Sequence, residues 1–136
     1  MARKLNILIV DDSLIMRVNL RRNLEGLGHD IVSEAVDGIS SITAYEKYKP
    51  NLVTMDITMP DMDGITAVKK IKEIDDDANV IMVTSHGQEA MVMNALKAGA
   101  KGYILKPVSP EKLRETIGKI FSDLESENSD ELLDEE

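Results

Sequence analysis

Short, continuous apolar runs alternate with longer amphipathic stretches five times along the chain. The runs are rich in valine, isoleucine and leucine. Continuous apolar runs of this length are typical of strands that are buried on both faces, as in a parallel sheet. The strands predicted from this pattern span residues 5–10, 30–35, 51–55, 79–83 and 102–105.

The stretches between these runs predict five helices, at residues 13–27, 38–49, 64–73, 88–98 and 110–124. Ser13 and Ser109 are good N-caps, and Pro110 suits the first position of a helix. Gly28 and Gly99 stand where helices are expected to end. Strands that alternate with helices imply right-handed βαβ units. We therefore expect an α/β fold, a doubly wound five-stranded parallel sheet between two layers of helices.

Polar side chains stand directly after four of the predicted strands. In chain order they are Asp11, Asp12, Asp56, Thr84 and Lys106. Because the carboxyl ends of parallel strands meet at one edge of a sheet, we expect these side chains to lie close together. Taken singly, each has an ordinary interpretation as a helix cap, a turn residue or a loop cation. The matched set favours a shared site.

The chemistry of these groups suits a divalent metal and a phosphoryl group. Clustered carboxylates repel one another, and a hard cation such as Mg²⁺ relieves that repulsion. A carboxylate is also a competent nucleophile toward phosphorus, with which it forms an aspartyl phosphate. Phosphoryl transfer needs mainly positioning and neutralisation of charge, which a metal and a lysine supply together.

Length and composition narrow the class of protein. The 136 residues suffice for one domain with a buried core, and the absence of cysteine excludes disulfides and thiolate metal sites. No signal peptide is visible, and no apolar stretch is long enough to cross a bilayer, so we expect a cytoplasmic protein.

The net charge of −9 is concentrated at the end of the chain. Residues 123–136 hold eight acidic and no basic side chains, so the remainder is close to neutral. An acidic chain without a basic stripe is a poor candidate for direct nucleic-acid binding. From residue 126 onward the composition predicts disorder, with Leu132 and Leu133 as the only apolar pair.

The strand-end residues belong to longer motifs. These motifs are Asp11-Asp12, Met55-Asp56-Ile57-Thr58-Met59-Pro60-Asp61-Met62-Asp63-Gly64, Val83-Thr84-Ser85 and Lys106-Pro107. Together they resemble a response-regulator receiver domain over residues 4–124, and in particular the stand-alone chemotaxis regulators of the CheY type. The resemblance implies a flavodoxin-like fold with strand order 2-1-3-4-5. With the composition of the chain's end, this resemblance predicts a receiver domain at residues 1–124 and an acidic, disordered tail at residues 125–136.

The resemblance assigns a role to each residue of the expected site. Asp56 would accept a phosphoryl group from the phosphohistidine of a histidine kinase. Mg²⁺ would be held by Asp12, Asp56 and the backbone carbonyl of Thr58, with Asp11 acting mainly through water. Lys106 would contact the phosphoryl group.

The same resemblance implies a conformational switch. Thr84 would close onto the phosphoryl group, and Tyr103 would swing inward behind it. That movement would repack the surface made by the fourth helix, the fifth strand and the fifth helix, which we call the switch face. The peptide bond between Lys106 and Pro107 is expected to be cis.

The helix predicted at residues 88–98 is unusually apolar for an outer helix. If Met91 and Ala95 face the sheet, Val92 and Leu96 cannot face it as well. One interpretation is a wide core stripe. The favoured interpretation is a partner-binding face that includes Val92, Leu96 and Tyr103.

Two positions beside the expected site bear on how long a phosphoryl group would last. Thr58, two residues after Asp56, is small and polar and should leave the path to phosphorus open to an external phosphatase. His86, two residues after Thr84, either influences dephosphorylation or lies in a solvated loop.

The expected function is a monomeric phosphorylation switch that relays a histidine-kinase signal to a protein target, with the flagellar motor switch as the expected target. Such a protein catalyses only its own phosphotransfer and autodephosphorylation. Two alternatives are an intermediate receiver in a multistep phosphorelay and a receiver fragment of a larger regulator. A magnesium-dependent phosphatase of the haloacid-dehalogenase type, which forms an aspartyl phosphate, is disfavoured, because such enzymes need a second carboxylate as general acid where Thr58 stands. The acidic tail is an inert end, a segment that docks on a basic partner, or one that folds back on the switch face.

Overall fold

The computed structural model describes residues 4–85 and 87–121, which form five strands and five helices. The strands are β1 (Asn6–Val10), β2 (Asp30–Ala35), β3 (Leu52–Met55), β4 (Val80–Thr84) and β5 (Gly102–Leu105). The helices are α1 (Leu14–Gly26), α2 (Gly38–Tyr48), α3 (Gly64–Ile74), α4 (Glu89–Ala98) and α5 (Pro110–Ile120). Strands and helices alternate strictly along the chain, as the hydrophobic pattern predicts.

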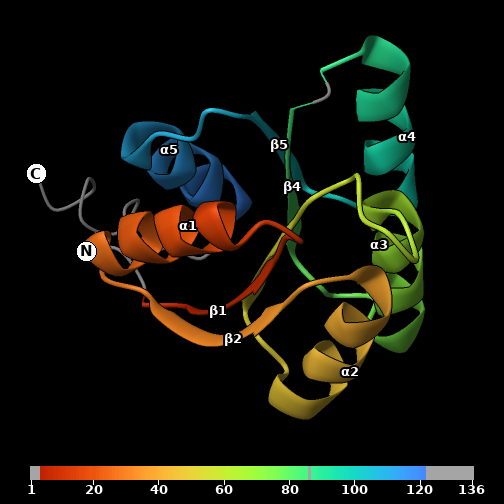
Figure 1. Ribbon diagram of the computed structural model, residues 1–136, viewed down its shortest axis with the longest axis horizontal. Coiled ribbons are helices and arrows are strands. Elements are labelled where there is room, and N and C mark those ends of the chain that lie inside the picture. The colour runs from red at the N-terminus through yellow and green to blue at the C-terminus, as the bar shows by residue number, and fades with distance from the viewer. Residues whose placement is uncertain (1–3, 86, 122–136) are drawn as a thin grey trace, which may run out of the picture.

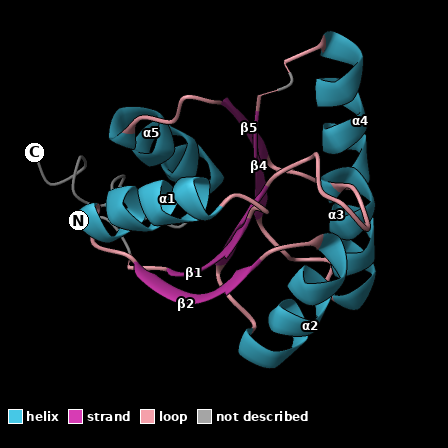
Figure 2. Cartoon of the chain, viewed as in Figure 1, coloured by secondary structure: helices cyan, strands magenta, loops and turns pink. Residues whose placement is uncertain are grey.

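The strands form one parallel sheet in the order β2-β1-β3-β4-β5. Helices α1 and α5 cover one face of this sheet, and α2, α3 and α4 cover the other (Figures 1 and 2). This arrangement confirms the expected flavodoxin-like, doubly wound α/β fold. The order of the strands reverses at the neighbouring strands β1 and β3. Sites in such sheets form outside the carboxyl ends of the strands at this point.

Two hydrophobic cores hold the helices against the sheet. In α5, Leu113 and Ile117 are spaced by one helical turn and are buried, with Phe121 continuing the same stripe. They pack with Leu20 and Leu24 of α1 against one face of the sheet. On the other face, the helix residues in the hydrophobic core come from α2, α3 and α4, and the buried ones are Ala44, Tyr45, Ala67, Val68, Ile71 and Ala95.

Local signals in the sequence place several helix ends correctly. The Ser13 hydroxyl caps α1 by accepting a hydrogen bond from the backbone N–H of Met16 at 3.3 Å. Ser109 caps α5, with Pro110 at its first position. Gly28 and Gly99 follow α1 and α4 with φ angles of 95° and 116°, a left-handed conformation that favours glycine.

Some predicted boundaries differ from the observed ones by one or two residues. Thr84, expected just after the fourth strand, is its last residue, because it still pairs with Leu105 of β5. The expected end of the last helix at residue 124, the domain boundary there and the acidic tail lie outside the described residues. Within the described ranges, no helix has the length and apolar character needed to span a membrane.

Thr54, inside β3, is fully buried, and its hydroxyl has no hydrogen-bond partner among the described residues. A buried hydroxyl without a partner has lost its hydrogen bonds to water and has gained no hydrogen bond within the protein. Thr54→Val, which keeps the shape, is therefore expected to raise the free energy of unfolding by about 1 kcal/mol. Urea unfolding measures this. The exposed Thr43→Val is the control and should change stability by less than about 0.5 kcal/mol; an unchanged or lower value for Thr54→Val would contradict the prediction.

Candidate functional site

Asp56 stands at the carboxyl end of β3, where the chain leaves the sheet. Its backbone N–H donates to the carbonyl of Val10 at 3.0 Å, which continues the pairing of β3 with β1 for one more residue. The residue is only 6% exposed. The loop that follows is held by α3, whose first residue, Gly64, donates its N–H to the carbonyl of Ile57 at 2.7 Å. Asp56 therefore projects from a fixed backbone.

Asp11 and Asp12 follow β1 and lie beside Asp56. Asp11 is 1% exposed, and one of its carboxylate oxygens accepts a hydrogen bond from the backbone N–H of Ser13 at 2.9 Å. Asp12 is exposed to solvent. The three carboxylates each bring an oxygen within 4.8 Å of the others, as the positions of the strand ends predict.

Lys106, directly after β5, brings a cation to this cluster. Its ammonium nitrogen lies 3.0 Å from a carboxylate oxygen of Asp11 and 3.6 Å from one of Asp56. Its backbone N–H donates to the carbonyl of Thr84 at 2.8 Å, which fixes the lysine against β4. The Lys106–Pro107 bond is cis, as expected.

The charges in the site do not balance. Burial raises the pKa of Asp56, and the negative charge of Asp11 raises it further, while Lys106 opposes these effects. The one ammonium contacts two of the three carboxylates, so the cluster keeps an excess of negative charge that a cation would offset. Carboxylate oxygens at this spacing, one exposed and two buried, fit a hard divalent ion that keeps part of its water shell.

Thr58 lies two residues after Asp56 on the same loop and is exposed. His86, the other residue expected beside the site, lies outside the described residues.

Thr84 and Tyr103 share the face of the sheet that α2, α3 and α4 cover. Thr84 is fully buried at the end of β4, and side chains alternate along a strand, so it faces the same way as Met82. Tyr103 pairs with Met82 across the two strands and is half-buried against the same core. Burial raises the pKa of its hydroxyl. The two expected switch residues are thus neighbours on one face.

Helix α4 divides its apolar residues between two sides. Met91 and Ala95 pack on the core next to the sheet. Leu96 is 43% exposed, and Val92 is half-buried. A single wide core stripe does not describe this helix, because Leu96 and its neighbour Met93 lie toward solvent.

Arg17 of α1 supports the loop that carries Asp11, and nothing in the sequence pattern indicated it. One of its terminal nitrogens donates to the backbone carbonyl of Asp11 at 2.9 Å. Its Nε donates to a carboxylate oxygen of Glu34 at 3.0 Å, and Arg21 donates to the other oxygen at 2.8 Å. Charge-assisted bonds of this kind are strong and directional. They hold the end of β1, and so Asp11, in place relative to β2.

Comparison with known proteins agrees with this fold. Residues 7–118 match the model of the response regulator receiver domain. The chain therefore belongs to the response-regulator receiver family.

Individual relatives are similar over most of their length. The chain is 48% identical over 116 residues to the chemotaxis protein CheY of Bacillus subtilis (strain 168), a match that covers 85% of this chain and 97% of the relative. It is 44% identical over 114 residues to CheY of Thermotoga maritima, with 84% and 95% covered. Among solved structures, a chain of the CheX-CheY-BeF3-Mg²⁺ complex from Borrelia burgdorferi superposes with a TM-score of 0.83 at 38% identity, covering 85% and 88%.

Proposed function

We propose that this protein is a phosphorylation switch in which Asp56 accepts a phosphoryl group from the phosphohistidine of a histidine kinase. The observation that carries the proposal is the group of three carboxylates with one ammonium at the switch point of the sheet. Asp56 is the carboxylate we assign as acceptor, because it lies within reach of both Asp11 and Lys106 and stands on a strand end that is hydrogen-bonded to Val10. The protein acts on itself and turns over no external metabolite.

In the proposed step, a carboxylate oxygen of Asp56 attacks phosphorus as the bond from phosphorus to the imidazole nitrogen of the kinase breaks. The electron pair of that bond returns to the imidazole, which then takes a proton from solvent. Lys106 shifts from the carboxylates toward the incoming phosphoryl oxygens and neutralises part of their charge. Asp12, Asp56 and the carbonyl of Thr58 would hold Mg²⁺, which supplies further neutralisation of charge, while Asp11 acts through water.

The proposed switch uses Thr84 and Tyr103. A phosphoryl group on Asp56 offers acceptor oxygens to the Thr84 hydroxyl. Movement of Thr84 would leave space on the face that Tyr103 shares, so the ring turns inward. This repacks the switch face of α4, β5 and α5, on which Val92 and Leu96 meet a partner. The phosphoryl group shifts the population by binding the active arrangement more tightly.

We propose chemotaxis as the setting and a flagellar motor switch protein as the target. The support is the similarity to two chemotaxis proteins at 44–48% identity over nearly their whole lengths. The exposed apolar side of α4 favours an output protein as partner over a further relay step. An external phosphatase would reach the phosphoryl group past the small side chain of Thr58.

Affinity capture from an extract of the native cells tests this proposal. The immobilised protein is presented with Mg²⁺ alone and with Mg²⁺ plus beryllofluoride, which mimics the phosphoryl group. We expect a flagellar switch protein to be captured only with beryllofluoride, and Asp56→Asn to capture none in either condition. Recovery of only a kinase or a phosphotransfer protein, equally in both conditions, would contradict the chemotaxis output and point to a phosphorelay.

A further inference from the structure

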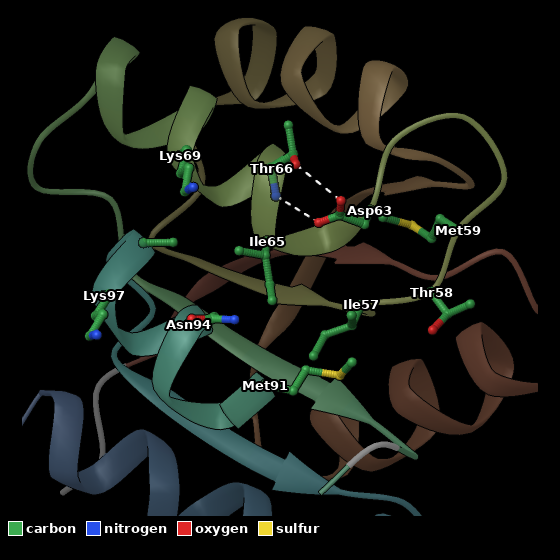
Figure 3. A pocket seen from close by; sticks show the side chains of 11 residues that line it. Ile57, Thr58, Met59, Asp63, Ile65, Thr66, Lys69, Met91, Asn94 and Lys97 are labelled. Atoms are coloured by element: carbon green, nitrogen blue, oxygen red, sulfur yellow. Dashed lines mark hydrogen bonds between the residues drawn. The ribbon is translucent and has the colours of Figure 1, made fainter. Parts of the chain in front are cut away.

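A groove of about 850 Å³ runs between α3 and α4, on the side of the domain away from α1 and α5. Its apolar wall is built by Ile57, Met59, Ile65 and Met91 (Figure 3). Met91 and Ile65 are only partly buried, so a further apolar group placed here would cover them. The groove lies beside the loop that follows Asp56 but contains none of the three carboxylates.

One end of this groove is positively charged. Lys69 of α3 and Lys97 of α4 line it, both exposed, and neither has an ion-pair partner within residues 4–85 and 87–121. Figure 3 shows the two lysines at the opposite end from Thr58. The one acidic lining residue, Asp63, already caps α3 by accepting hydrogen bonds from Thr66. The groove therefore suits an apolar group flanked by carboxylates.

We propose that residues 129–136 of this same chain occupy the groove. Their sequence, Ser-Asp-Glu-Leu-Leu-Asp-Glu-Glu, places two leucines between acidic residues on both sides. Leu132 and Leu133 cover the apolar wall, and the flanking carboxylates lie near Lys69 and Lys97. The proposal concerns the groove between α3 and α4 and does not depend on phosphorylation of Asp56.

The geometry of the described residues allows this contact. At the end of α5, Ile120 lies against Gly102, within 3.6 Å of where a Cβ there would stand. Gly102 begins β5 only four residues after Ala98, which lines the groove, so these points lie within roughly 14 Å. Leu132 comes eleven residues after Phe121, a length that spans roughly 36–40 Å when extended. A domain of this size is only about 35 Å across. The eleven residues are therefore long enough to carry Leu132 from the end of α5 to the groove.

Paramagnetic relaxation in the full-length protein tests the proposal. The chain contains no cysteine, so Ser129→Cys provides a single site for a nitroxide label next to the leucine pair. We expect the label to broaden the backbone amide signals of α3 and α4 along the groove, such as those of Lys69, Met91 and Asn94. Broadening centred on the solvent-facing side of α4 and on β5 and α5, or no localised broadening, would overturn the proposal.

Two sets of variants separate specific contact from general attraction. Lys69→Glu combined with Lys97→Glu, and separately Leu132→Ser combined with Leu133→Ser, should each abolish the broadening. Lys70→Glu is the matched control, because Lys70 is exposed on the same helix but does not line the groove, and it should leave the broadening in place. A mixture of spin-labelled protein with ¹⁵N-labelled, unmodified protein should show none. Broadening in that mixture would mean a second copy is the occupant and would overturn the intramolecular contact.

Discussion

Gly64→Ala is expected to lower the free energy of unfolding by more than about 3 kcal/mol, at the upper end of what overpacking produces. A Cβ at this position would stand 2.0 Å from the backbone oxygen of Asp56 and 2.8 Å from its carbonyl carbon. The obstacle is backbone, so no side-chain rotation relieves it. The start of α3 would have to move away from β3, and the hydrogen bond from Gly64 to Ile57 would be lost.

Urea unfolding followed by circular dichroism measures this effect, with Gly118→Ala as the matched control. Gly118 also lies in a helix, but a Cβ there would meet nothing within 4 Å. Because alanine is the better helix former, the control should gain up to about 1 kcal/mol. A Gly64→Ala protein within about 1 kcal/mol of the parent would show that α3 can move without cost, and that Gly64 does not fix the loop of Asp56.

The sequence predicts which residues meet at the site, but it does not predict the close approach of Gly64 to the backbone of Asp56. Asp11, Asp56 and Lys106 could be placed together from the sequence because the strands are buried, parallel and short, so their ends coincide at one edge. Gly64 stood in a recognised motif, but its contact with Asp56 depends on how α3 packs against β3. The hydrophobic periodicity of the sequence does not indicate the distance between Gly64 and the Asp56 backbone.

Other features depend on residues far apart in the sequence. Arg17 and Glu34 bond across seventeen positions, and nothing in the pattern around either one predicts the pair. The groove between α3 and α4 exists because Met91 and Ile65 only partly close the space between two helices. For α4, the apolar pattern left two interpretations open, a wide core stripe and a partner-binding face. It could not show how well the helices meet each other.

Asp56→Asn is expected to abolish stable phosphorylation by a small phosphodonor such as acetyl phosphate in the presence of Mg²⁺. The amide has no anionic oxygen to attack phosphorus, and the aspartyl phosphate cannot form. Incorporation of radioactive phosphate measures this, with Asp12→Asn as the control. Asp12→Asn weakens the metal site but keeps Asp56 as acceptor. This control should therefore still be labelled, but more slowly than the parent. Persistent labelling of Asp56→Asn at the parental level would overturn the assignment of the acceptor.

The same substitution is expected to stabilise the metal-free protein at pH 7, by about 1 kcal/mol. Burial of Asp56 and the nearby charges of Asp11 and Asp12 outweigh the opposing effects of Lys106 and the Ile57 backbone, so the pKa of Asp56 is raised in the folded state. A raised pKa means that the ionised form weakens the fold above that pKa. The gain in the free energy of unfolding of Asp56→Asn over the parent should therefore be at its full size at neutral pH. It should shrink as the pH falls through the raised pKa toward the ordinary aspartate value of 3.8.

Mg²⁺ should reverse this order of stability. A cation that binds the folded carboxylates stabilises the parent by about 2.7 kcal/mol at a hundredfold excess over its dissociation constant. Asp56→Asn offers the cation one carboxylate fewer and should gain less. Thermal unfolding with a chelator and then with Mg²⁺ measures both effects. Equal shifts in the two proteins would mean that Asp56 is no ligand. A parent that is already the more stable protein with the chelator would mean that repulsion among the carboxylates does not weaken the fold.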